Sequence, residues 1–406
     1  MVGMSKFFEE HAKHMSCQAL GIHSEPCLEH FLRDMPKYVT SNFKYFAPLC
    51  LLPIVIDWRN LNKKKIRQRL EYYFHCSTMG VTIGYIINCL ICLMRKGRFG
   101  IYHFVFIPSF IGSASVHFLA SARVIEFFET SIFQCNIETF LLMKKFLISR
   151  LIFDSKILQT YIFMISSAII LQGKLLYNTK EFWILESNSQ PKEIENQENC
   201  KCQLHPNMGC QQYLYQGVKK YFLLGLTLDI LKSVISTVSA KRSSQSKRLD
   251  LIKNFQIRSL ALFTVNVGVY RFTHCFLNKY IPGCNSLNHL LSSFLAGVCY
   301  TFYPQKQLFA FAVVHAIRTL WSIIQIENAN TKNTFLRRLL HAPIGRILFP
   351  FGVAHLVHID CLKPEYSSIL GSAITNAITN KYPLTGRRQI ELVKQKVEAT
   401  YKNRNL

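Results

Sequence analysis

The chain has 406 residues, of which 50% are hydrophobic and 17% are charged, and its mean hydropathy is +0.15. Soluble proteins carry about 25% charged residues, so an ordinary soluble protein is a poor fit. The formal net charge is +25, yet no nucleic-acid-binding motif accompanies it, and we expect no nucleic-acid partner. Several apolar runs reach about 20 residues, the length that a helix needs to cross a bilayer. The sequence therefore predicts an all-α, polytopic membrane protein.

A polar region rich in Cys and His occupies residues 1–42, without the continuous apolar core of a signal peptide. The first half of the chain follows, with apolar segments predicted at residues 43–58, 76–94, 101–122, 124–148 and 157–177. The fourth of these segments contains five charged residues, so we expect it to lie in the interface or inside a helical bundle. These residues are Glu126, Glu129, Glu138, Lys144 and Lys145.

A polar linker, residues 178–216, carries a second group of Cys and His residues. The second half then shows apolar segments at residues 217–238, 255–277, 287–303, 307–326 and 344–362, and a basic C-terminal tail covers residues 363–406. Because basic loops favour one face of a membrane, we expect an even number of spans in each half.

The two halves resemble each other in the order of their parts. "HPNMGCQQYLYQGVKKYF", which begins in the linker, matches "HSEPCLEHFLRDMPKYVTSNFKYF" near the start, since both run from His and Cys to Lys-Tyr-Phe. "CLMRK" then lies opposite "CFLNK", and "SFIGSASVHF" lies opposite "SFLAGVCYTF". We therefore predict two tandem repeats of about four to five apolar helices each, in residues 43–177 and 217–362. Substrates of duplicated membrane transporters bind near the repeat interface.

Basic residues gather in two loops beside apolar segments, which is typical of topology determinants and, as an alternative, of a site for anionic lipid headgroups. The first group is Arg59, Lys63, Lys64, Lys65, Arg67 and Arg69; the second is Lys241, Arg242, Lys247, Arg248 and Lys253.

Cys and His residues precede the first apolar segment of each half. Thiolates and imidazoles are zinc ligands, but the spacings match no standard zinc finger. A metal site, a disulfide or redox pair, and a buried structural cap are the three interpretations, of which we favour the cap. The residues are Cys17, His23, Cys27 and His30 in the first half, and Cys200, Cys202, His205 and Cys210 in the second.

Ionisable residues within the apolar segments of the second half are candidate ligand-binding residues, because charges in lipid are costly. Asp229 and Lys232 are three apart, close enough on a helix to neutralise each other. A bound carboxylate or headgroup is one interpretation, and interhelical pairing is the one that we favour. The full set is Asp229, Lys232, Arg271, His274, His315 and Arg318.

Small residues predict close helix packing and a possible homo-oligomer: Gly80 and Gly84 form a Gly-x-x-x-Gly pair, and Ser293 and Gly297 have the same spacing. Catalytic motifs are missing, because three residues rather than four separate His30 from Asp34, and no phosphate loop or nucleophile elbow is present. We therefore expect neither an enzyme nor a cofactor.

Several stretches together resemble the transmembrane protein 135 family, also called peroxisomal membrane protein 52. They are "CQALGIHSEPC", "KYFAPL", "CLMRK…PSFIGSASVHFLASAR" and "LLSSFLAGVCYTFYPQKQLFAFAVVHAIRTLW", and the resemblance covers roughly residues 23–361. It implies a distant relation to the translocase channels of the inner mitochondrial membrane. It also implies a multi-pass protein of peroxisomal and mitochondrial membranes, linked to fatty-acid and cholesterol handling and to mitochondrial fission. No catalytic residues are established for this family, so the resemblance assigns none to this chain.

Three functional hypotheses follow from the sequence and the resemblance. The first is a non-enzymatic protein that moves or organises membrane lipids and influences mitochondrial dynamics. The second is a membrane scaffold that recruits fission or organelle-import proteins through its basic loops and its Cys and His residues. The third, an enzyme acting on acyl chains, requires a polar pocket that joins Asp229, His274 and His315.

Overall fold

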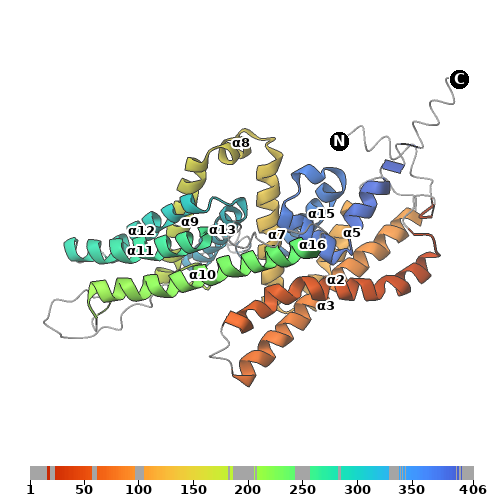
Figure 1. Ribbon diagram of the computed structural model, residues 1–406. Helices are drawn as coiled ribbons and strands as arrows, with labels where there is room; N and C mark the ends of the chain where they lie inside the picture. Colours follow the sequence, from red (N-terminus) through yellow and green to blue (C-terminus); the bar gives the residue numbers. More distant parts are fainter. Residues whose placement is uncertain are drawn as a thin grey trace. The chain divides into compact units, whose positions relative to one another are not determined.

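The computed structural model is helical, and its described part contains no β-strand (Figure 1). The structure describes residues 16–18, 23–56, 62–96, 105–181, 183–185, 205, 208–242, 257–281, 285–328, 338, 340, 342, 344–389, 391–392 and 395. The helices form two compact units, one made of residues 1–144 and 343–406, and the other of residues 145–342.

The first unit is built around a hairpin of two long helices, α2 (Cys27–Ile56) and α3 (Lys63–Lys96). α5 (Phe106–Ala114), α6 (Val116–Leu119) and α7 (Ala122–Met143) follow in the chain. The C-terminal part adds α15 (Ile344–Leu362), η3 (Pro364–Tyr366) and α16 (Ile369–Ile378). Apolar side chains from all of the long helices form one core, including Phe46, Ile87, Phe128 and Phe349.

The second unit also contains a hairpin of two long helices, α10 (Cys210–Arg242) and α11 (Arg258–Tyr280). α12 (Asn285–Ala296), the 3-10 helix η2 (Gly297–Phe302) and α13 (Lys306–Glu327) follow it. α8 (Leu147–Asp154) and α9 (Lys156–Tyr177) come from earlier in the chain. The Ser155 hydroxyl caps α9 by accepting a hydrogen bond from the Leu158 amide at 3.2 Å.

The compact units do not follow the predicted division of the chain at the linker. α9, the fifth predicted segment of the first half, packs against α12, η2 and α13 of the second unit. α15, the fifth predicted segment of the second half, packs against α5 and α7 of the first unit. Each unit therefore combines four predicted segments of one half with the fifth of the other.

Within the described part of the chain, five helices are long and apolar enough to cross a membrane: α3, α9, α11, α13 and α15. This composition is compatible with an integral membrane protein, as the sequence predicts. Large apolar side chains are exposed on these helices, for example Leu93, Ile157 and Phe272.

The predicted apolar segment at 101–122 is interrupted in its described part, where α5 ends and α6 begins. Serine hydroxyls compete for the backbone carbonyls there: Ser113 donates to Ser109 at 2.6 Å, and Ser115 donates to Gly112 at 2.7 Å. α5 and α6 together are too short for a span.

The predicted C-terminal tail contributes to the core of the first unit. Ile374, Ile378 and Tyr382 are buried among its apolar side chains. The Arg387 guanidinium donates to the buried Asp360 carboxylate of α15 at 2.7 Å. Residues 363–389 are therefore part of the folded unit.

Candidate functional site

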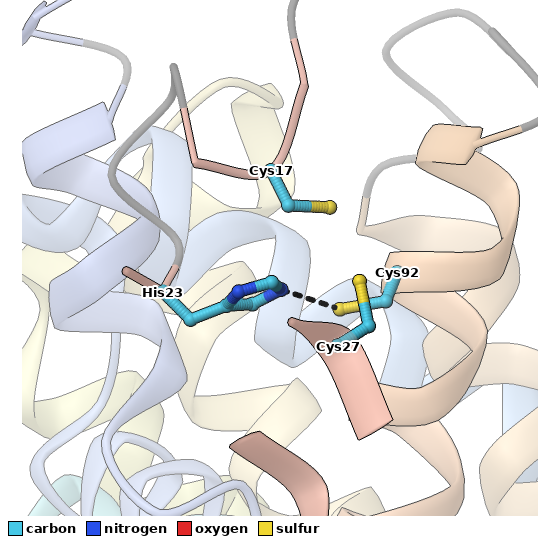
Figure 2. Close-up of side chains that lie close together, drawn as sticks. All are labelled: Cys17, His23, Cys27 and Cys92. Atoms are coloured by element: carbon cyan, nitrogen blue, oxygen red, sulfur yellow. Dashed lines mark hydrogen bonds between the residues drawn. The ribbon is translucent and has the colours of Figure 1, made fainter. Parts of the chain in front are cut away.

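Four side chains converge beside the open end of the α2–α3 hairpin, and we call Cys17, His23, Cys27 and Cys92 the first cluster (Figure 2). Cys17 and His23 lie on the segment before α2, Cys27 is the first residue of α2, and Cys92 lies near the end of α3. One ligand atom from each residue lies within 4.8 Å of the other three. All of them are buried except Cys27, which is exposed.

The His23 ring is held in one orientation by its backbone. Its Nδ1 atom lies 2.6 Å from the Glu25 carbonyl oxygen. Because a carbonyl can only accept, Nδ1 carries the proton, and the lone pair is on Nε2. Nε2 faces the cluster and lies 3.5 Å from the Cys92 sulfur (Figure 2).

The thiols of the first cluster differ in acidity because they interact with one another. A hydrogen bond from Cys92, opposed by burial, lowers the pKa of Cys17 to about 6. Partial burial and the negative charge on Cys17 raise the pKa of Cys27. One thiolate is therefore favoured, and each further thiolate is repelled by the first unless a cation lies between them.

His205, Cys210 and Cys275, the second cluster, have the same arrangement at the α10–α11 hairpin. Cys210 is the first residue of α10, and Cys275 lies near the end of α11. The Nδ1 atom of His205 donates to the Met208 carbonyl at 2.8 Å, and Nε2 lies 3.2 Å from the Cys275 sulfur.

Cys92 and Cys275 are the site residues that sequence reasoning missed, although the matched stretches "CLMRK" and "CFLNK" begin with them. His30, a predicted candidate, is not a member of the first cluster. Its ring stacks on His23 at 4.7 Å, and its Nε2 atom faces Asp34 at 3.7 Å. Cys200 and Cys202 lie outside the described residues.

The predicted polar residues of the second half make separate contacts. The Asp229 carboxylate accepts from the amides of Ser259 and Leu260, at 3.2 and 2.9 Å, and so caps the start of α11. Lys232 was the expected partner of Asp229; its side chain is outside the described part. Arg271 donates to the Tyr213 carbonyl and lies over the Tyr213 ring.

The remaining residues of that set lie in two further contacts. The His274 ring packs against His289 and Tyr270. His315 and Arg318 both donate to the buried Glu181 carboxylate, at 2.8 and 3.1 Å. Burial opposes ionisation of Glu181, but these two donors lower its pKa overall. The described contacts therefore do not join Asp229, His274 and His315 in one pocket.

The predicted small residues contact helices of their own chain. A side chain at Gly80 would collide with Asn42 of α2, and one at Gly84 would collide with the Ile378 carbonyl of α16. Gly297 lies against Met164 of α9, and the buried Ser293 hydroxyl donates to the His289 carbonyl at 2.7 Å. These small residues let helices approach closely within each unit.

The beginning of α3 forms a basic surface that also contains two apolar side chains and one acidic side chain. Lys63, Ile66, Arg67, Leu70 and Glu71 line a shallow depression of about 440 Å³. Their spacing places them on one side of the helix. The second basic group, residues 241–253, lies mostly outside the described residues.

Comparisons with protein-family models, curated proteins and solved structures gave no match for this chain. The resemblance to the transmembrane protein 135 family therefore stays a prediction.

Proposed function

We propose that this chain is a non-enzymatic, multi-pass membrane protein that moves or organises lipids, in peroxisomal or mitochondrial membranes, and influences mitochondrial fission. The organelles, the fatty-acid or cholesterol cargo and the link to fission come from the family resemblance. The lipid role rests on the depression at the beginning of α3, where basic and apolar side chains lie together.

This depression lies on α3, which is longer than a helix needs to be to cross a bilayer. α3 has 34 residues, or about 51 Å at 1.5 Å per residue, whereas a hydrocarbon core is about 30 Å thick. With the apolar part of α3 in the membrane, the basic part reaches the headgroup layer. Lys63 and Arg67 there attract anionic headgroups, and Ile66 and Leu70 offer apolar contact to the adjoining acyl chains.

Helix packing supports the proposal that the chain is duplicated. In the first unit, α2 packs on α3, α3 on α5, and α15 on both α5 and α7. In the second unit, α10 packs on α11, α11 on α12, and α9 on both α12 and α13. These contacts follow the same order in both units, with α15 in the first and α9 in the second, while α16 packs in the first unit alone among the described helices. Duplicated helical units of this kind are common among membrane transporters.

Lipid transfer by the purified full chain in anionic vesicles tests this proposal. We expect the protein to accelerate transfer of a fluorescent fatty acid or sterol between vesicles. The double variant Lys63→Glu/Arg67→Glu should lower the rate about tenfold, because it repels anionic headgroups. The matched variant Lys219→Glu/Lys220→Glu makes the same charge change on exposed residues of α10 and should keep the rate.

Transfer no faster than in protein-free vesicles, with a folded sample, would contradict the lipid role. A membrane scaffold for fission or import proteins is the second candidate, because the same basic surface is open to partner proteins. It predicts that the Lys63→Glu/Arg67→Glu variant loses its protein partners but keeps its lipid-transfer rate.

A further inference from the structure

We propose that the chain binds two zinc ions, one at the first cluster and one at the second cluster. This inference does not depend on the lipid role, and it concerns the ends of the two helical hairpins rather than the basic surface.

The first cluster supplies the donors of a structural zinc site, three thiols and one imidazole. A tetrahedral ion with Zn–S bonds of about 2.3 Å holds its sulfur ligands about 3.8 Å apart. The four donor atoms already lie within 4.8 Å of one another, and His23 Nε2 is 3.5 Å from the Cys92 sulfur. Small side-chain rotations therefore bring all four to bonding distance around one ion.

The histidine of each cluster is oriented as in known metal sites. A metal-binding imidazole usually donates its other N–H to a carbonyl or carboxylate, which fixes the ring and its tautomer. His23 does this with the Glu25 carbonyl, and His205 does it with the Met208 carbonyl. In both clusters the unprotonated Nε2 atom is left facing the thiols.

Secondary structure places the cysteines where a metal ion has a mechanical effect. Cys27 and Cys210 are the first residues of α2 and α10. Cys92 and Cys275 lie near the ends of α3 and α11. An ion at either cluster therefore joins the open end of a hairpin to the segment that precedes it.

A metal ion accounts for the first cluster better than a disulfide or an apolar cap. A disulfide uses two thiols and leaves the third thiol and the His23 lone pair unused. A cap requires neither four ligand atoms within 4.8 Å of one another nor an imidazole Nε2 atom turned toward the thiols. Zinc satisfies all four donors at once and neutralises the thiolates.

The second cluster supports a zinc site independently of the first. Its three described donors repeat the positions of His23, Cys27 and Cys92 in a separate hairpin. An aromatic ring one turn into the first helix stacks on the histidine in both cases: His30 on His23 at 4.7 Å, and Tyr213 on His205 at 4.6 Å. Two separate hairpins thus present a histidine and two cysteines at the same positions.

Metal analysis of the purified full chain tests the proposal. The protein is incubated with zinc, dialysed and analysed for zinc, copper and iron, and we expect two zinc ions per chain. The variant Cys17→Ser/Cys27→Ser should retain one ion, and His205→Ala/Cys210→Ser should also retain one. These changes lie before or at the first residue of a helix, so they spare the apolar spans.

Two controls separate ligand loss from misfolding. Cys89→Ser lies one turn from Cys92 on the same helix, outside the first cluster, and should keep both ions. At the exposed Cys27 position, Cys27→His should keep both ions because imidazole also binds zinc, whereas Cys27→Ala should weaken one site at least tenfold.

Several results would overturn the proposal. A wild-type protein without zinc, or one that binds copper or iron instead, contradicts it. So does an intact mass that shows a disulfide among Cys17, Cys27 and Cys92. If Cys17→Ser/Cys27→Ser keeps both ions, the first site is refuted, and if His205→Ala/Cys210→Ser keeps both, the second site is refuted.

Discussion

The two clusters differ in their surroundings, although a histidine and two cysteines hold the same positions in both. His30 stacks on the histidine of the first cluster and faces Asp34, whereas Tyr213 stacks on that of the second and lies under Arg271. In each, a histidine precedes a hairpin, a cysteine begins it, and a cysteine lies near its end. The donors are the common feature, and the groups that hold them in place vary.

The hairpins also differ away from the clusters. Asp229 of α10 accepts two backbone hydrogen bonds from the start of α11. In the first hairpin, the Tyr73 hydroxyl of α3 donates to the Phe43 carbonyl of α2 at 2.9 Å. A buried carboxylate thus joins the helices of the second hairpin, whereas a neutral hydrogen bond joins those of the first. We therefore expect a metal ion to contribute more to the stability of the first hairpin.

Of the changes that we predict, metal removal should have the largest effect on stability. A strong chelator should lower the thermal unfolding midpoint of the wild-type protein by about 10 °C, because structural zinc contributes several kcal/mol or more. The measurement is fluorescence-detected melting of the full chain in detergent. The variant that combines Cys17→Ser, Cys27→Ser, His205→Ala and Cys210→Ser should melt at one temperature with and without chelator. A chelator-dependent shift in that variant would contradict the assignment.

Loss of the Asp229 carboxylate should have the second-largest effect on stability. Asp229→Ala leaves one buried and one partly buried amide at the start of α11 without their acceptor. We therefore expect the free energy of unfolding to fall by about 2 to 3 kcal/mol. Tyr73→Phe removes one neutral hydrogen bond and should cost about 1 kcal/mol. Denaturant titration of the two variants measures both effects. Equal losses would show that the two hairpins are fixed equally well.

Exchange of the stacking rings should have the smallest effect. His30→Tyr makes the first cluster like the second, and Tyr213→His makes the second like the first. Loss of an outer partner that is hydrogen-bonded to a metal ligand lowers metal affinity by about 10- to 100-fold. The ring only stacks on the histidine, so we expect each change to alter zinc affinity by less than about tenfold. Competition with a fluorescent chelator measures the affinity. A hundredfold change in either variant would mean that the stacked ring itself is a ligand.

Much of the fold could be predicted from apolar runs. The predicted segments 76–94, 157–177 and 307–326 lie within α3, α9 and α13. α3 begins earlier, at Lys63, because Lys, Arg, Gln and Glu are good helix formers that hydropathy ignores. The exchange of α9 and α15 was not predictable, since an apolar face does not specify which neighbour covers it.

The candidate site was predictable in part. His23, Cys27, His205 and Cys210 stand out because polar sequence surrounds them. Cys92 and Cys275 lie in apolar runs, where cysteine is usually a small hydrophobic residue, and only hairpin pairing brings them to the histidines. The internal match of "CLMRK" with "CFLNK" is the sequence signal that marks these two cysteines.

Zinc K-edge X-ray absorption of the purified full chain tests the central claim most directly. Our account predicts sulfur-rich coordination, with Zn–S bonds of about 2.3 Å and a nitrogen at about 2.0 to 2.1 Å. The variant His205→Ala/Cys210→Ser isolates the first cluster and should give three sulfur ligands and one nitrogen. A spectrum with only oxygen and nitrogen ligands would contradict both sites and leave the two clusters as apolar caps.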